Sequence, residues 1–395
     1  MVSWQKLRRS HNAACVEKKS YPASSAFMIP AGQAVWMRRD FARFADEGYR
    51  RNVIAHRAVA MIATAAGSVP WKLSQRRARS GTQMLENHPL LTLLNKPNPL
   101  QGGTELSEAL VAFKLIAGNA YLHAIGPRGQ APMELHVLRP ERVTIIAGQG
   151  GIPKAYRYTI DERSIDIPVD AVSGQSRVLH FKNFNPLDDW YGLSPMEAAA
   201  YSIDQHNQCG AWNQGLLQNG ARPSGALMVK AAEGQPATLS ETQYARLRGQ
   251  LDEQFSGAMN AGRPLLLEGG LEWKEMSLNP KDMDFINIKH SSARDIALAF
   301  GVPPQLLGIP GDNTFANLAE ARLALWEQTI LPLLEHMTDA LNNWLVPMFD
   351  TSLELSLDQE AIPVLSAKRD AYWERIAKAD FLSDDEKRKL LGIGV

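Results

Sequence analysis

The chain has 395 residues, with 42 Lys and Arg against 42 Asp and Glu, and 45% of its residues are hydrophobic. This length is enough for about two or three domains, each with its own core. The longest apolar runs are far shorter than the roughly 18–20 residues of a membrane span, and nothing resembles a signal peptide. We therefore expect no membrane partner and a cytosolic product in which Cys15 and Cys209 are reduced thiols.

The zero net charge hides an asymmetry along the chain. Residues 1–80 contain 15 Lys and Arg but 4 Asp and Glu, and the remainder carries the opposite excess. Proteins that clamp DNA usually present a basic surface, because each phosphate that they neutralise releases counterions. The loop and helices of residues 280–349 lack such a surface, which argues against an enzyme that acts on DNA.

The N-terminal part is predicted to be an arm followed by a helix. Residues 1–33 show no periodicity, which indicates a poorly ordered arm or, alternatively, a basic arm that lies on a neighbour or near DNA. The next segment is helical up to Gly67 and contains an apolar stripe. The stripe consists of Ile54, Ala58, Met61, Ile62 and Ala65. Arg50, Arg51 and Arg57 form either a solvated face or pairs with acidic neighbours.

Short helices and strands alternate over residues 69–184. The predicted helices are 88–94 and 104–117, the second capped by Thr104. The predicted strands are 69–74, 121–125, 134–138, 142–146, 155–158 and 178–181. Arg76, Arg77 and Arg79 form a basic run that we expect in an exposed turn. This mixture of elements predicts an α+β fold class.

A long helix and a smaller excursion follow. Ser194 is the expected cap of helix 193–219, with Pro195 at the first helical position, where proline is favoured. Residues 222–277 then contain two kinds of element. The predicted strands are 226–229, 264–268 and 271–274, and the predicted helix is 240–255.

A punctuated loop between two helices is the most distinctive stretch. The helix 282–300 ends at Gly301, and Pro303 and Pro304 prevent its continuation because proline donates no backbone hydrogen bond. The loop of residues 306–315 contains two glycines and a polar tip.

The chain restarts as a helix near Asn317, the expected cap, with Glu320 completing a capping box. Its apolar residues recur at spacings of three and four: Leu323, Trp326, Ile330, Leu333, Met337, Leu341 and Trp344. Pro332 lies in the middle, where it should kink the helix without ending it. A strand over 353–357 and a charged helical tail over 367–391 complete the chain.

The sequence shows little catalytic chemistry. It contains no phosphate loop, dinucleotide fingerprint, paired metal-binding histidines or nucleophile elbow. Asp188 with Asp189, and Asp282 with Asp284, are carboxylate pairs of the kind that hold Mg²⁺ in nucleases. Neither pair has a neighbouring Glu or His, so a solvated loop and a helix start are the favoured interpretations. We expect no catalytic residue, cofactor or metal.

The run Gly301-Val302-Pro303-Pro304-Gln305-Leu306-Leu307-Gly308, with the polar loop and proline-containing helix behind it, resembles the portal proteins of tailed bacteriophages and of related gene transfer agents. Four further stretches match in the family's order, at residues 49–52, 68–71, 95–99 and 192–196. The matching stretches extend over roughly residues 40–395.

The resemblance implies an α+β portal fold with an α/β wing, a two-helix stem, a small clip, a tunnel loop, a kinked helix and a short crown. The implied segments are the N-terminal arm 1–33, wing 34–192, first stem helix 193–222, clip 223–279, second stem helix 280–301, tunnel loop 302–316, kinked helix with return strand 317–358, and helical crown 359–395.

The resemblance also implies functional residues. The DNA-facing tunnel loop contains Gly308, Gly311, Asp312, Asn313, Thr314 and Phe315, and Pro332 makes the kink. The expected channel wall of the stem consists of Lys281, Asp284, Ile288, Lys289, Ser292 and Asp295. The expected motor- and adaptor-facing clip residues are Glu241, Arg246, Glu268, Glu272 and Trp273.

The function implied is a homo-oligomeric ring, usually of about twelve subunits, at one vertex of a phage or phage-like particle assembled in the bacterial cytoplasm. Double-stranded DNA would pass through it, with a terminase motor, the major capsid protein and a head–tail adaptor as partners. ATP hydrolysis would belong to the motor, so the chain is not an enzyme. A monomeric adaptor of the head–tail junction and a metal-dependent DNA-processing enzyme using Asp188 and Asp189 are the alternatives.

Overall fold

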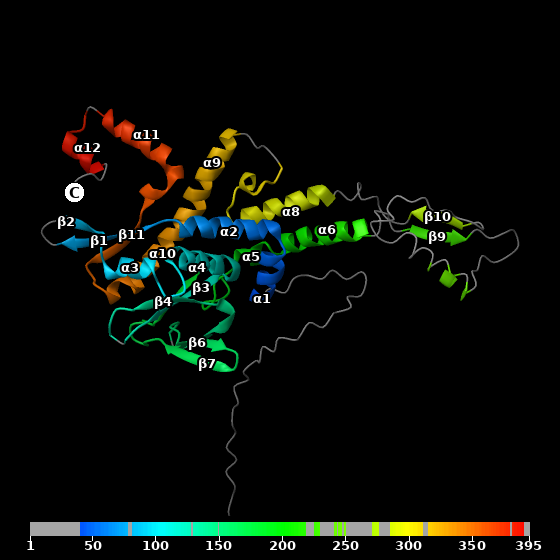
Figure 1. Cartoon of the computed structure of the whole chain (residues 1–395), viewed down its shortest axis with the longest axis horizontal. Coiled ribbons are helices and arrows are strands. Elements are labelled where there is room, and N and C mark those ends of the chain that lie inside the picture. The colour runs from blue at the N-terminus through cyan, green and yellow to red at the C-terminus, as the bar shows by residue number, and fades with distance from the viewer. Residues whose placement is uncertain are drawn as a thin grey trace, which may run out of the picture. The chain divides into compact units, whose positions relative to one another are not determined.

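The computed structural model describes residues 40–77, 81–127, 129–148, 150–218, 225–229, 241–242, 244–246, 249, 271–275, 285–310, 315–379 and 381–390. These residues belong to the second of two units, Met37–Val395 (Figure 1). The predicted arm of residues 1–33 and Cys15 lie outside the described residues, whereas Cys209 is a buried free thiol.

Helices α1 (Phe41–Arg43), α2 (Val53–Gly67) and α4 (Gly103–Ala117), with the π-helix η1 (Phe44–Arg50), begin the core. Asn52 caps α2 by accepting hydrogen bonds from the backbone N–H groups of Ile54 and Ala55. In the predicted stripe, Ala58 and Ile62 are buried and the others are partly exposed. A Cβ at Gly67 would lie 2.9 Å from the Thr104 carbonyl oxygen, so glycine permits the close approach of α2 and α4. Helix α4 begins one residue before Thr104, and Gly102 takes the capping position predicted for Thr104.

A three-stranded antiparallel sheet brings together strands from near the two ends of the described chain. It has the order β11 (Leu353–Leu357), β1 (Trp71–Arg77), β2 (Gly81–Leu85), and it pairs Leu73 with Leu355, both buried. The predicted strand 353–357 is confirmed. Arg76 and Arg77 were expected in an exposed turn, and this prediction is wrong for both. They lie in β1, opposite Thr82 and Gly81 of β2.

Two further sheets enclose a smaller core. One has the order β4 (Glu134–Leu138), β3 (Asn119–Ile125), β8 (Val178–Lys182), and the other β5 (Val143–Ile146), β6 (Ala155–Ile160), β7 (Arg163–Pro168). Their shared core contains Tyr121, Leu138, Val143, Tyr156, Ile167 and Val178. The sequence did not predict β7, which is exposed except at Ile167. The short 3₁₀ helix η2 (Pro140–Arg142) completes this part, whereas helix α3 (Pro89–Asn95) packs its leucines into the main core.

The predicted long helix after Ser194 is present in two pieces. Ser194 accepts a hydrogen bond from the Met196 N–H and caps α5 (Pro195–Ala198), and α6 (Ala200–Gln218) follows after a break at Ala199. Beyond it, β9 (Gly225–Val229) pairs antiparallel with β10 (Leu271–Glu275). The predicted strand 264–268 and most of the predicted helix 240–255 lie outside the described residues.

The C-terminal half is mainly helical. It contains α8 (Phe285–Ala299), the 3₁₀ helix η4 (Pro304–Leu307), α9 (Phe315–Leu325), the π-helix η5 (Trp326–Ile330) and α10 (Leu331–Trp344). Asn317 is therefore inside α9 and does not cap it, because the helix begins two residues earlier than predicted. In the sequence, the 3₁₀ turn η6 (Val346–Met348) precedes β11, and the 3₁₀ turns η7 (Gln359–Ala361) and η8 (Pro363–Leu365) follow it.

The tail predicted as one helix is two helices, α11 (Ser366–Ala377) and α12 (Asp384–Leu390). They are drawn in red in Figure 1. Among the described helices, none has the length and apolar character needed to cross a membrane.

Candidate functional site

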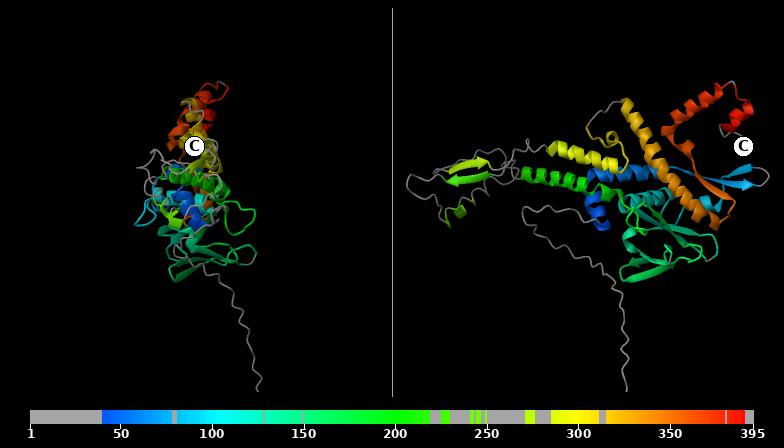
Figure 2. Two further views of the ribbon diagram at one scale, coloured as in Figure 1. Left: turned by 90° about the vertical axis from the view of Figure 1, so that its right-hand side faces the viewer. Right: turned by 180° about the vertical axis from the view of Figure 1, so that it is seen from behind.

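Helices α6 and α8 form the scaffold of the candidate site. They pack side by side, as both views in Figure 2 and the contacts between them show. Ile203 of α6 and Ile296 of α8 are fully buried. At the other end of the pair, the rings of Trp212 and Phe285 stack with centroids 4.2 Å apart and planes 19° apart. The two helices thus contact each other along most of the length of α8.

Polar contacts fix which face of α8 meets α6. Ser292 donates a hydrogen bond from Oγ to Gln205 Oε1 at 3.2 Å, and only 1% of its surface is exposed. Ser202 donates from Oγ to Asp295 Oδ2 at 3.3 Å. Ser292 thus faces α6 inside the chain, and its place on a channel wall stays a prediction.

The other expected wall residues lie near the face of α8 that meets α6. Ile288 and Asp295 are four and three residues from Ser292 and are both exposed, Ile288 by 41%, so they lie at the edge of that face, where Asp295 accepts the hydrogen bond from Ser202. Lys289 is partly buried beside α6, where its charge acts on His206 and Cys209. Lys281 and Asp284 lie outside the described residues.

Burial and Lys289 together set the protonation of two α6 side chains. Burial, and secondly the nearby Lys289 ammonium, lower the pKa of His206. The neutral imidazole faces the side-chain amide of Asn52, with Nδ2 of Asn52 3.2 Å from Nδ1 of His206. Burial raises the pKa of the Cys209 thiol, and Lys289 partly opposes that rise. Neither group therefore adds a charge to this interface near neutral pH.

The end of α8 is a Schellman cap. Gly301 has φ of 66°, its N–H bonds to the Leu298 carbonyl at 3.0 Å, and the Val302 N–H bonds to the Ala297 carbonyl at 2.9 Å. Val302 and Ala297 are both buried, which supplies the hydrophobic contact of this motif. The predicted helix end at Gly301 is confirmed.

The first arm of the loop is bound to α8. Gly308 has φ of 70° and closes η4. Ile309 is buried in a small cluster with Ala293 and Ala297, and Nη2 of Arg294 donates to the Pro310 carbonyl at 2.5 Å. The expected loop residues Gly311, Asp312, Asn313 and Thr314 lie outside the described residues, and Phe315 is the first residue of α9. The chain is thus fixed to the core up to Pro310.

The interruption predicted at Pro332 takes the form of a π-helical turn. The Leu331 N–H bonds to the Trp326 carbonyl, five residues back, and Pro332 follows as the second residue of α10. This turn brings Thr329 to the cap of α8, where its Oγ1 donates to the Gly301 carbonyl at 2.7 Å. Sequence reasoning missed Thr329, for which Pro332 was the only nearby signal.

Helix α10 is fastened to the sheet and to the smaller core. Asn342 makes two hydrogen bonds of 2.8 Å with the backbone of Leu355 in β11, one as donor and one as acceptor. The Trp344 indole N–H donates to the Ser176 carbonyl at 2.7 Å. The loop therefore emerges between two helices that are both anchored in the body.

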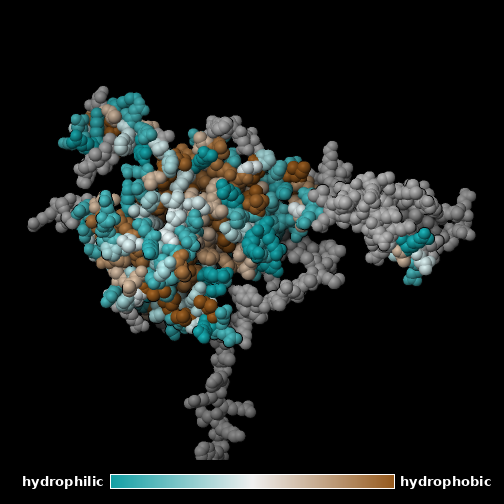
Figure 3. Space-filling model, viewed as in Figure 1, coloured by the Kyte–Doolittle hydropathy of each residue, from teal (hydrophilic) through white to brown (hydrophobic). Residues whose placement is uncertain are grey.

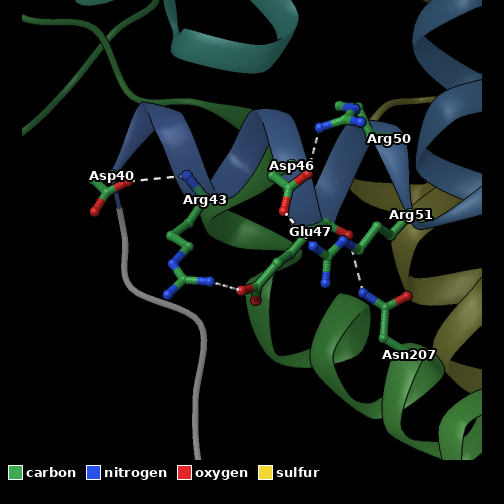
Figure 4. A network of polar contacts seen from close by, with 7 residues as sticks. All are labelled: Asp40, Arg43, Asp46, Glu47, Arg50, Arg51 and Asn207. Atoms are coloured by element: carbon green, nitrogen blue, oxygen red, sulfur yellow. Dashed lines mark hydrogen bonds and ion pairs between the residues drawn. The ribbon is translucent and has the colours of Figure 1, made fainter. Parts of the chain in front are cut away.

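The basic residues near η1 have acidic partners in the same chain (Figure 4). Asp46 pairs with Arg50 and with Arg51, each at 2.8 Å, and Arg43 pairs with Glu47. Asn207 of α6 donates to the backbone carbonyl of Glu47 at 3.0 Å, which links this network to the helix pair. Arg50 and Arg51 thus have an acidic partner within the same chain.

The Asp188–Asp189 pair shapes a turn. Asp188 Oδ1 accepts hydrogen bonds from the N–H groups of Trp190, at 2.7 Å, and Tyr191, at 3.1 Å. In the described part of the chain, no three or more His, Cys, Asp or Glu side chains are grouped to hold a metal ion. This observation does not favour the alternative of a metal-dependent enzyme at Asp188, and Asp282 with Asp284 lies outside the described residues.

The expected clip residues are only partly described. Glu241 and Arg246 are exposed residues in helical conformation. Glu272 and Trp273 are in β10, opposite Met228 and Leu227 of β9, and Glu268 lies outside the described residues.

Comparison with known proteins identifies the class to which this arrangement belongs. The family model described as phage portal protein matches residues 54–392. The chain therefore belongs to the phage portal protein family, a class of structural virion components that are not enzymes, as the resemblance predicts.

Individual relatives agree with this assignment. The chain is 47% identical over 351 residues to an uncharacterized protein of Rickettsia bellii (strain RML369-C), with 89% of each chain covered. It is 24% identical over 343 residues to the portal protein of Enterobacteria phage HK97, covering 84% of this chain and 76% of that protein. Among solved structures, a chain in the neck of a native gene transfer agent particle, computed with C12 symmetry, matches with 44% identity and a TM-score of 0.68, covering 92% of this chain and 96% of the other.

Proposed function

We propose that this protein forms a twelve-membered portal ring in the neck of a phage-like particle of the gene transfer agent type. Double-stranded DNA enters through the ring, driven by a separate motor ATPase, and later leaves through it. Head–tail adaptors dock on the outer end. The observation that carries this proposal is the match, over 92% of the chain, to a protein in a neck of C12 symmetry.

The surface of the helix pair supports association between subunits. On α8, Ile286, Ile288 and Leu298 are exposed, the last by 79%. Figure 3 shows hydrophobic residues in separate patches among hydrophilic ones on the described part of one face. Apolar residues exposed on a single chain are typical of surfaces that another subunit covers. A stable ring would bury on the order of 2,000 Å² or more at each contact.

The segments take the roles that the resemblance implies. Residues 193–222 and 280–301 form the stem, and residues 223–279 form the clip that meets the motor and the adaptor. The channel wall of the stem contains Lys281, Asp284, Ile288, Lys289, Ser292 and Asp295. The loop of residues 302–316 projects into the lumen with Asp312, Asn313 and Thr314 at its tip. The anchoring of Ile309 and Pro310 on α8 supports this role, because it fixes the point on α8 from which the tip of the loop begins.

A short acidic tip suits passage of DNA. Asp312 contributes a negative charge and the neighbouring residues are uncharged, so the tip offers no cation to bind a phosphate. A contact without tight ion pairs allows the duplex to slide. The ring thus acts as a passive channel whose energy source lies in the motor.

The first test is negative-stain imaging of the purified protein with mass determination of the same sample. Rings with an open centre and about twelvefold symmetry support the proposal. A chain that stays monomeric beside its capsid protein contradicts it and supports the adaptor.

The loop is tested by deleting residues 311–314. We expect intact rings whose particles package or retain less DNA, measured as DNA per particle. Replacing the same four residues with Gly-Ser-Gly-Ser is the matched control for length. Normal DNA content in both variants would contradict the role of the loop.

A further inference from the structure

A buried chain of polar side chains joins α6 to the start of α2. Oδ1 of Asn52 accepts hydrogen bonds from the backbone N–H groups of Ile54, at 3.1 Å, and Ala55, at 3.0 Å. Nδ2 of Asn52 lies 3.2 Å from Nδ1 of His206 and donates to Oδ1 of Asn207 at 3.0 Å. Asn52 is 1% exposed and His206 is 7% exposed. The Asn52 amide thus makes four hydrogen bonds, two as acceptor and two as donor.

Backbone groups at both ends fix the direction of this chain. The first turn of α2 presents N–H groups and requires the oxygen of Asn52, so the NH2 group of Asn52 points towards α6. At the other end, Nδ2 of Asn207 donates to the Glu47 carbonyl (Figure 4), so Oδ1 of Asn207 faces Asn52. Turning either amide over would place like groups against each other. Nδ1 of His206 must therefore accept a hydrogen bond, which requires a neutral imidazole with its proton on Nε2.

A proton on Nδ1 of His206 is incompatible with this arrangement. The new N–H group would face the NH2 group of Asn52, donor against donor. Asn52 could meet the imidazolium only by turning its oxygen away from the first turn of α2, which would leave that helix uncapped. The N-terminal end of α2 is itself positive, and it repels a cation. Burial, and secondly the Lys289 ammonium, lower the pKa of His206 in agreement with this geometry.

The carboxylates near His206 are directed to other partners. Asp46 and Glu47 form ion pairs with arginines close to them in sequence, and Asp295 accepts a hydrogen bond from a serine of α6. Asp204 is two positions from His206, a spacing at which side chains of one helix do not face each other. The other titratable groups on the elements packed here are Arg50, Arg51 and His56 at η1 and α2, Cys209 in α6, and Lys289, His290 and Arg294 in α8.

We propose that the contact between Asn52 and His206 is an acid-released latch, whose opening loosens the joint between α6 and the start of α2. The inference concerns contacts within one chain, so it goes beyond the proposed channel and holds for a free subunit and a ring alike. Above about pH 6.5 the latch is closed. Below that pH the open state binds a proton at His206 that the closed state excludes, so opening increases by at most about tenfold per pH unit.

Hydrogen–deuterium exchange of the full chain measures the latch. The backbone amides of Ile54 and Ala55 exchange when Asn52 releases them, and fragmentation in the mass spectrometer resolves the two positions. The rates are corrected for the chemical effect of pH on exchange. The opening constant should then rise by up to about thirtyfold between pH 7.5 and pH 5.0. An opening constant that stays level over this range would overturn the proposal.

His206→Asn removes the titration and keeps the acceptor. The side-chain oxygen of Asn takes about the position of Nδ1 and can accept from Asn52, but it binds no proton in this pH range. The opening constant of this variant should not rise on acidification. His336→Asn, at an exposed histidine of α10, is the matched control and should keep the pH dependence of the wild type. A wild-type pH dependence in His206→Asn would overturn the proposal.

Asn52→Asp should reverse the response to pH. Asp caps a helix about as well as Asn, so one oxygen keeps the hydrogen bonds to the first turn of α2. The second oxygen of the carboxylate accepts a hydrogen bond from a protonated His206 and attracts its charge. The opening constant should therefore fall as the pH drops from 7.5 to 5.0. A rise like that of the wild type would show that the contact with Asn52 does not control opening, and would overturn the latch.

Discussion

Gly301 is the residue whose replacement tests most directly how α8 is joined to the helix that follows the loop. A Cβ built on Gly301 would lie 2.7 Å from Oγ1 of Thr329, closer than real Cβ contacts allow. The residue also has φ of 66°, which L-residues with a side chain rarely adopt. Gly301→Ala therefore introduces two separate penalties.

The two penalties have different sizes and causes. The left-handed backbone costs a residue other than glycine about 1–2 kcal/mol. The steric contact adds about 1–3 kcal/mol, because Thr329 is β-branched and stiff, and moving it breaks its hydrogen bond to the Gly301 carbonyl. We expect Gly301→Ala to lower the free energy of unfolding by about 2–5 kcal/mol in total.

Gly308 provides the matched control. It has φ of 70°, but no atom lies within 4 Å of a Cβ built there. Gly308→Ala should therefore carry the backbone penalty alone, about 1–2 kcal/mol. Urea unfolding followed by circular dichroism, at one protein concentration in the same state of assembly, measures the difference.

Removing the Thr329 side chain should separate the two penalties. In a Thr329→Ala background, Gly301→Ala should cost only the backbone part, so a double-mutant cycle should show coupling of about 1–3 kcal/mol. Equal losses for Gly301→Ala and Gly308→Ala, together with coupling below about 0.5 kcal/mol, would refute the packing of the π-helical turn on the α8 cap.

Two further predictions concern the body. Asn342→Ala removes both hydrogen bonds to Leu355 and leaves backbone groups of β11 unpaired. We expect the free energy of unfolding to fall by about 1–3 kcal/mol. Urea unfolding measures this loss, with Asn343→Ala as a control on the same helix. Burial, and secondly Lys182, lower the pKa of His180 to about 3. Below about pH 6.5, His180 therefore binds a proton in the unfolded chain but not in the native chain. The contribution of His180 to the free energy of unfolding is complete above that pH and is lost as the pH falls towards 3. The loss is at most about 1.4 kcal/mol per pH unit. His180→Gln should flatten the decline between pH 6 and 4 in a series of unfolding curves, and a decline as steep as in the wild type would contradict this assignment.

Much of the fold could be predicted where a residue acts on its own backbone. Ser194 with Pro195 set the start of α5, and Gly301 with Pro303 and Pro304 set the end of α8, because capping, φ and a missing donor are local properties. The alternation in 353–357 predicted β11, whose inward residues Leu353 and Leu355 are buried. These signals required no knowledge of what lies across the core.

Predictions failed where the outcome depends on a distant partner. Arg76 and Arg77 were expected in a turn, because the sequence does not show that β2 extends the pairing of β1. Asn317 was expected to cap α9, but the helix already begins at Phe315. The strand β7 contains the alternating run Ser164-Ile165-Asp166-Ile167, but this run is short and ends at Pro168, and it was not recognised as a strand from the sequence.

Predictions for the candidate site also succeed for local properties, whereas a distant partner decides what surrounds other side chains. The periodicity of α8 predicted an apolar face and a polar face, and the family resemblance together with the helical phase placed Ser292 on the channel wall. The structure encloses Ser292 against Gln205, since α6 covers that side of the helix with a hydrogen-bonding partner. Polarity thus reports whether a side chain needs a hydrogen bond, and not whether water, DNA or a neighbouring helix provides it.

The link between Pro332 and Thr329 extends this reasoning to the loop. Proline predicts a defect in the helix, but it does not predict that the defect is a π-helical turn or that the turn directs Thr329 to the Gly301 carbonyl, 28 residues away in sequence. One contact joins the two helices that bracket residues 302–316. In the proposed ring, a force on the loop from passing DNA would therefore reach both helices together, and Thr329→Ala should change DNA retention in the same direction as a change in the loop itself.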